Sequence, residues 1–196
     1  MKQLFFAFLI ALFSCFNAFS QQDKLLDLIT SSLWIYDTNP VHVDESQKIN
    51  IAFVDVVNAN KNGNGENSKS SRVDVFKLLY ENGLQDPVNE IDFAKSRLRK
   101  AVCFTAVAML SDKDRYLFFL DLAKHCMSDS LGINPNKSLL KEYCGLMLVD
   151  IFLKNKFKVD NKVELKDLDA YVEHYKDIMS KEFYYNAKII IELYKK

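Results

Sequence analysis

The sequence predicts an all-α protein, a single-domain bundle of about five to seven helices packed around a central buried helix at residues 87–110. Three observations lead to this fold class. Glycine and proline number only five and three, while aromatic residues reach 13%, which favours packed helices over a β-sandwich rich in turns. Apolar residues recur at helical spacing along most of the chain. Residues 101–110 (AVCFTAVAML) contain Thr105 as their only polar side chain, so this stretch needs neighbours on every side.

The first twenty residues predict a signal peptide. Lys2 precedes an apolar run at residues 4–13, and residues 18–20 (AFS) place small side chains at the two positions that a signal peptidase reads. We therefore expect residues 1–20 to be removed and residues 21–196 to form the helical domain of a secreted or periplasmic protein. The apolar run is too short for a membrane-spanning helix.

A second processing route is lipidation. Residues 12–15 (LFSC) resemble a bacterial lipobox, although Phe13 stands where a small residue is usual. In such a motif the cysteine becomes lipid-modified, so Cys15 is the lipidation candidate. This is the one membrane contact that the sequence predicts.

The mature chain keeps three cysteines, Cys103, Cys126 and Cys144. In an oxidising compartment they are disulfide candidates, and their odd number allows at most one bridge among them. Burial as unbridged thiols is the alternative, because an unpaired cysteine packs like a small apolar side chain. Their spacing contains no C-x-x-C pair, and we predict neither a metal site nor a cofactor.

The first elements follow in chain order. Residues 23–36 (DKLLDLITSSLWIY) predict a helix that ends at a turn cluster. A second helix opens near Asp44. Residues 49–57 within it alternate in a way that also suits a strand, and helix is the preferred interpretation. Residues 58–71 (NANKNGNGENSKSS) predict a flexible loop, because their likeness to a calcium loop lacks the acidic ligands that calcium requires.

The next elements surround the predicted central helix. A short amphipathic helix at residues 72–82 precedes it, since Gly83 marks a stop. Residues 115–127 predict the helix that follows, and residues 128–136 predict a loop.

The last elements are two long helical segments. Residues 135–156 form the first, interrupted in its apolar part only by Gly145 and Asp150. Residues 164–194 contain neither glycine nor proline, and their apolar spacing predicts one helix, bent near Ser180.

Asp150 is the first candidate site residue, because a carboxylate within residues 146–152 is surrounded by apolar positions. It must either lie on a narrow wet stripe or be buried with a cationic partner. Arg97, Arg99 and Arg115 are the candidate partners. An inter-helix ion pair is the structural interpretation, and a catalytic carboxylate is the functional one.

Phe118 and Tyr185 are the remaining candidates. They are difficult to place on the buried faces of their helices, so they could line a groove for a partner or an apolar pocket between helices.

Composition and motifs limit the function. Basic and acidic residues number 26 each, a balance that argues against nucleic-acid binding, and no catalytic or nucleotide-binding motif is present. The leading prediction is a non-enzymatic secreted or periplasmic protein that binds another protein, as inhibitors, immunity proteins and accessory subunits do. The alternative is a carrier of a small apolar or lipid-like ligand held between helices. The third hypothesis is an enzyme that uses Asp150 as a buried carboxylate.

Overall fold

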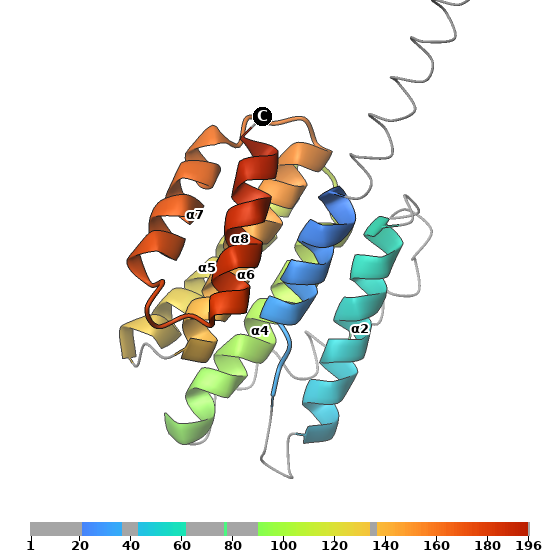
Figure 1. Ribbon diagram of the computed structural model, residues 1–196. Coiled ribbons are helices and arrows are strands. Elements are labelled where there is room, and N and C mark those ends of the chain that lie inside the picture. Colours follow the sequence, from blue (N-terminus) through green and yellow to red (C-terminus); the bar gives the residue numbers. More distant parts are fainter. Residues whose placement is uncertain (1–20, 37–42, 62–76, 78–89, 134–136, 196) are drawn as a thin grey trace, which may run out of the picture.

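The computed structural model describes residues 21–36, 43–61, 77, 90–133 and 137–195. Over these ranges every regular element is a helix, and seven helices form one compact domain (Figure 1). The all-α fold class is therefore confirmed. In chain order the helices are residues 21–32, α2 (Val43–Lys61), α4 (Glu90–Leu110), α5 (Tyr116–Ile133), α6 (Lys137–Lys156), α7 (Lys162–His174) and α8 (Lys181–Tyr194).

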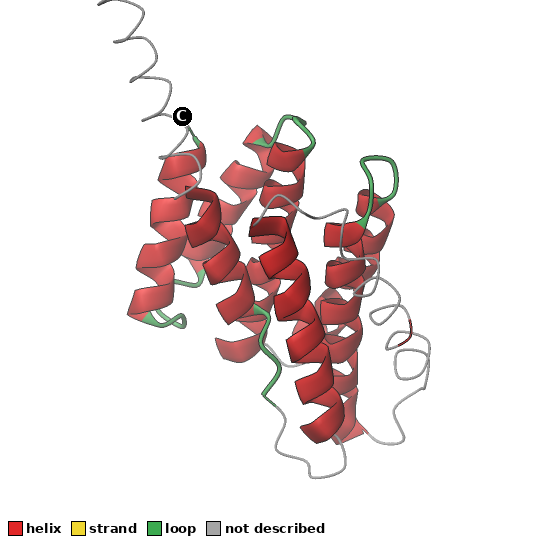
Figure 2. Cartoon of the chain, turned by 90° about the vertical axis from the view of Figure 1, so that its right-hand side faces the viewer, coloured by secondary structure: helices red, strands yellow, loops and turns green. Residues whose placement is uncertain are grey.

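The helices lie side by side and are joined at the two ends of the bundle (Figure 1, Figure 2). α4 packs against α2 and α5, α6 packs against α5 and α7, and α8 packs against α7. From α4 to α8 each helix therefore packs against the next one along the chain, as short connections favour. α4 also contacts α6.

α4 carries the apolar stretch that the sequence singles out. Residues 101–110 are buried except for Phe104, which is half-buried. The hydroxyl of Thr105 is fully buried and donates to the Ala101 carbonyl at 2.7 Å, so the one polar side chain of the stretch is satisfied within its own helix. Residues 87–89 lie outside the described part, and the role of this helix as the centre of the bundle stays a prediction.

α2 confirms the helical interpretation of residues 49–57 and corrects the loop predicted after it. The helix continues to Lys61, so residues 58–61 are its last turn, and residues 62–71 lie outside the described part. The reason is that Asn60 is buried: its amide donates to the Val56 carbonyl at 2.9 Å.

The first helix ends earlier than predicted: the chain bends at Leu33, and residues 34–36 form neither helix nor strand. A buried side chain of α2 holds this segment. The Asn50 amide accepts a hydrogen bond from the Ile35 backbone N–H and donates one to the Ile35 carbonyl, each at 2.9 Å. Asn50 thus takes the place of a neighbouring backbone and satisfies both polar groups of Ile35 in the interior.

The loop predicted at residues 128–136 is wrong over residues 128–133, because α5 continues to Ile133. One glycine within a helix costs only about 1 kcal/mol, so Gly132 by itself does not end α5. Residues 134–136 lie outside the described part of the chain, as does nearly all of the helix predicted at residues 72–82.

The single long helix predicted at residues 164–194 is also wrong. It is two helices, α7 and α8, which run in opposite directions (Figure 1). The backbone N–H groups of Ile178 and Met179 donate to the Tyr175 carbonyl at 3.0 Å. The hydroxyl of Ser180 then accepts from the Phe183 N–H at 3.2 Å, which makes Ser180 the N-cap of α8. The turn lets both apolar faces reach the same core, whereas a straight helix would carry one of them away from it.

Gly145 sets the distance between α6 and the first helix. A Cβ atom at this position would lie 2.7 Å from the Ser32 Cβ and 2.9 Å from the Leu33 Cγ. The Ser32 Cβ is fixed to the backbone and cannot turn away. The close packing of these two helices therefore requires the absence of a side chain at residue 145.

We expect Gly145→Ala to lower the free energy of unfolding by about 2 kcal/mol. Overpacking costs up to about 3 kcal/mol, and the better helix propensity of alanine recovers about 1 kcal/mol. Ser32→Gly should recover part of the loss in the double variant, because it removes the nearest clashing atom. Urea denaturation measures all three variants, and an alanine variant as stable as the parent protein would contradict this account.

Candidate functional site

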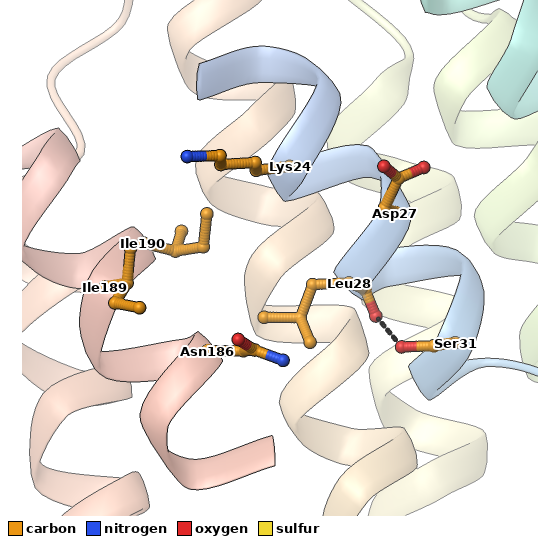
Figure 3. A pocket seen from close by; sticks show the side chains of 7 residues that line it. All are labelled: Lys24, Asp27, Leu28, Ser31, Asn186, Ile189 and Ile190. Atoms are coloured by element: carbon orange, nitrogen blue, oxygen red, sulfur yellow. Dashed lines mark hydrogen bonds between the residues drawn. The ribbon is translucent and has the colours of Figure 1, made fainter. Parts of the chain in front are cut away.

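A surface groove of about 420 Å³ lies between the first helix and α8 (Figure 3). It joins residues that are more than 150 positions apart in the sequence. Five of the seven residues that line it are exposed, and Leu28 and Ile190 are buried. The full lining is Lys24, Asp27, Leu28, Ser31, Asn186, Ile189 and Ile190.

The first-helix wall of the groove is mainly polar, and the α8 wall is mainly apolar. Ser31 donates its hydroxyl to the Leu28 carbonyl at 3.0 Å (Figure 3), which keeps that side chain against its own helix. Asp27 forms an ion pair with Lys61 of α2. On the opposite wall Ile189 is 51% exposed, so an apolar side chain borders the groove in open contact with solvent.

Tyr185, a predicted candidate, lies one helical turn before Ile189 on α8. Positions i and i+4 share a helix face, and Tyr185 is 61% exposed. Its ring packs edge-on against Tyr184 at a centroid distance of 5.5 Å. Tyr185 and Ile189 together form an exposed apolar strip beside the groove, which we call the α8 strip.

Phe118, the other aromatic candidate, does not join this surface. It lies in the first turn of α5 and is 63% exposed. Tyr185 lies near the start of α8, which begins at the opposite end of the bundle (Figure 1). The structure therefore places the two exposed aromatic candidates on separate surfaces.

Asp150 is buried, at 4% exposure, and its partner is Lys124 of α5. The predicted partners were Arg97, Arg99 and Arg115, and this part of the prediction is wrong. Arg115 instead pairs with Asp112, at 3.9 Å between Nε and Oδ2. Because α5 and α6 pack against each other, Lys124 lies close enough to reach Asp150.

A second ion pair lies beside the first, between Lys154 of α6 and Glu164 of α7. Burial opposes the charge on Lys154, but the hydrogen bond that Lys154 donates to Glu164 and the negative charge of Asp150 outweigh it and raise the lysine pKa. The buried Tyr116 also faces this cluster, and burial followed by the Asp150 charge raises its pKa. These contacts tie α5, α6 and α7 together.

The Asp150 cluster forms an ion-pair network between helices, as the structural interpretation expects. Asp150 does not line the groove of Figure 3. One of its carboxylate oxygens, Oδ1, is buried and has no hydrogen-bond partner. Within the described residues, no group of three or more His, Cys, Asp or Glu side chains is arranged to hold a metal ion.

The cysteine candidates are all buried. Cys103, Cys126 and Cys144 form no disulfide with one another. Burial raises the pKa of Cys103 to about 12 and raises that of Cys144 as well, so these two thiols resist the deprotonation that reactive cysteines need. Cys15 lies outside the described residues.

Glu142 is a buried carboxyl group that the sequence reasoning missed. It is 3% exposed, and Ser138 donates to its Oε1 at 2.7 Å, whereas Oε2 has no partner. Burial raises its pKa against the opposing effects of the Ser138 hydrogen bond and of nearby lysines. Helical spacing in the sequence could have predicted this burial, because Glu142 shares a helix face with the buried Leu139 and Leu146.

Comparison with known proteins adds no family to this description. No protein-family model matches the chain, and neither a curated protein nor a solved structure is detectably similar to it. Among the helices that the structure describes, none combines the length and apolar character needed to cross a bilayer.

The Lys124–Asp150 pair predicts an asymmetric response to mutation. Lys124→Met should lower the free energy of unfolding by about 2 kcal/mol, because Asp150 would remain buried without its ionic partner. Asp150→Asn should cost less, about 1 kcal/mol, since Lys124 is partly exposed and its amine can turn towards water. Urea denaturation of both single variants and of the double variant measures these free energies of unfolding. A double variant less stable than Lys124→Met alone would contradict it.

Glu142 predicts a pH dependence. Because its pKa is raised in the folded state, the folded protein retains a proton that the unfolded chain has released. Protonated Glu142 therefore adds to the free energy of unfolding at pH values below the pKa of this group in the unfolded chain. That contribution is lost as the pH rises through the higher pKa of Glu142 in the folded protein. Glu142→Gln should flatten this decline and raise the free energy of unfolding at pH 7 by about 1 kcal/mol.

The control for this measurement is Glu182→Gln, because Glu182 is exposed in the first turn of α8. Stability curves from pH 4 to pH 8 compare the two variants with the parent protein. Equal pH profiles for the parent protein and Glu142→Gln would rule out this role of the buried carboxyl group.

Proposed function

We propose that this protein is a secreted or periplasmic, non-enzymatic helical protein that binds another protein. The groove between the first helix and α8, together with the α8 strip, is the proposed binding surface. The observation that carries this proposal is the exposure of Tyr185 and Ile189 beside a groove with a buried apolar floor. An amphipathic segment of a partner could place apolar side chains against Leu28 and Ile190.

The form of the groove favours this function over a ligand carrier. Its volume of about 420 Å³ is large enough for a small molecule. However, five of its seven residues are exposed, and four of the seven have polar side chains. A small apolar ligand is usually enclosed over most of its surface, whereas a partner helix can cover an open groove and leave its polar edge in water. The carrier remains the second candidate because the floor is apolar.

The predicted compartment is part of the same proposal. A signal peptide at residues 1–20 would export the chain, and lipidation of Cys15 is the proposed alternative outcome of processing. An accessory protein of the cell envelope would then meet its partner outside the cytoplasm. The mass of the purified mature chain tests this directly, because cleavage before Gln21 and acylation at Cys15 give different masses.

We expect Ile189→Asp to weaken partner binding by about 30-fold, since a charge at an apolar contact costs about 2 kcal/mol of binding energy. Ile51→Asp is the matched control, because Ile51 is 61% exposed and lies on α2, away from the groove. Native mass spectrometry of the protein extracted gently from its host identifies the partner, and titration with that partner measures both variants. An equal loss of partner affinity in both variants would reject the groove as the binding surface.

The same spectra test the carrier. A non-covalent mass of a few hundred daltons that is lost from Ile189→Asp and retained by Ile51→Asp would favour the ligand carrier over the interaction protein.

A further inference from the structure

One end of the bundle carries exposed apolar side chains that the proposed binding surface does not use. Leu117 and Phe118 are consecutive exposed residues in the first turn of α5, and Val163 is exposed in the first turn of α7. Single exposed apolar residues are common on protein surfaces, but these three belong to helices that begin at the same end. We call this surface the α5–α7 end.

Contacts between helix ends show that these residues belong to one end. The ring of Tyr116 stacks on Phe157, which follows α6, at a centroid distance of 5.0 Å. The Lys156 amine donates to the Met109 carbonyl at 3.4 Å and to the Asn60 amide oxygen at 2.9 Å. The ends of α2, α4 and α6 therefore meet where α5 and α7 begin.

The described chain also enters the bundle at the α5–α7 end. The first helix begins there at Gln21, beside the carboxyl end of α8 (Figure 1). Six peptide units separate Cys15 from Gln21, and six extended residues span at most about 22 Å. α4 alone is about 30 Å long. A lipid on Cys15 would therefore keep the α5–α7 end near the bilayer.

The charges of the α5–α7 end suit a phospholipid surface. Lys113, Arg115, Lys158 and Lys162 are exposed there. Asp112, Asp114 and Asp160 are exposed there too, and Arg115 pairs with Asp112. Exposed apolar side chains flanked by lysine and arginine are the combination that binds an anionic membrane interface.

We infer that the α5–α7 end is a membrane-facing surface, on which Leu117, Phe118 and Val163 contact anionic phospholipid. This inference extends the proposed lipidation of Cys15 and is independent of the groove. It assigns opposite tasks to separate surfaces: the α5–α7 end lies against the bilayer, and the α8 strip, on the side of the bundle, stays open to a protein partner.

Site-specific photo-crosslinking tests the inference in the full chain. Phe118 is replaced with benzoylphenylalanine, and Ile51, which is equally exposed on the side of the bundle, is replaced in the control. Both proteins are expressed in a bacterial host and irradiated in the intact cell envelope. Mass spectrometry then reports lipid adducts and, on the same sample, the acyl mass at Cys15.

The expected result is phospholipid adducts from position 118 at several-fold higher yield than from position 51. Protein adducts in place of lipid from position 118, equal lipid yields from both positions, or no adduct at position 118 would each overturn the inference. The acyl mass is read separately. Lipidation without lipid adducts at position 118 therefore rejects this orientation alone, and lipid adducts without acylation support the surface while rejecting the tether.

Discussion

The close approach of the first helix to α6 at Gly145 is the constraint on which the rest of the structure depends. At this position the two helices are so close that even a methyl group would collide with Ser32 and Leu33. The approach lets the buried leucines of the first helix join the same core as α6. The same helix then supplies one wall of the groove. The position of that wall thus depends on the absence of a side chain at residue 145.

Buried charge is the second constraint. The apolar segments of α5, α6 and α7 enclose Asp150 and its neighbours, and two lysines from different helices balance the acidic groups. Such pairs contribute little net stability, because each charge loses its hydration. Their effect is specificity: if α5 or α6 slid by one turn, a carboxylate would be left in the core without its cation. The network therefore favours one register of these three helices over the alternatives.

The sequence predicted the elements better than their ends and contacts. Apolar spacing found the helices because each must bury a stripe. Apolar spacing did not separate α7 from α8, because the apolar stripes of the two helices continue in register except for a four-residue step between Met179 and Phe183. The capping role of Ser180 appears only when both helices turn towards one core. The partner of Asp150 depended on the alignment of α5 with α6. The groove combines residues 24–31 with residues 186–190, a pairing that no local pattern contains.

The Asn50 side chain has a consequence for how the molecule opens. It holds both backbone groups of Ile35, and neither can be released into the interior without leaving a polar group unsatisfied. Local unfolding of residues 33–36 must therefore expose Asn50 and disturb α2 at the same time. The first helix, residues 33–36 and α2 consequently form one cooperative unit in hydrogen exchange. One wall of the groove therefore belongs to that unit, whereas the other wall, α8, is held to α7 by the ion pairs of Lys188 with Asp169 and Glu173.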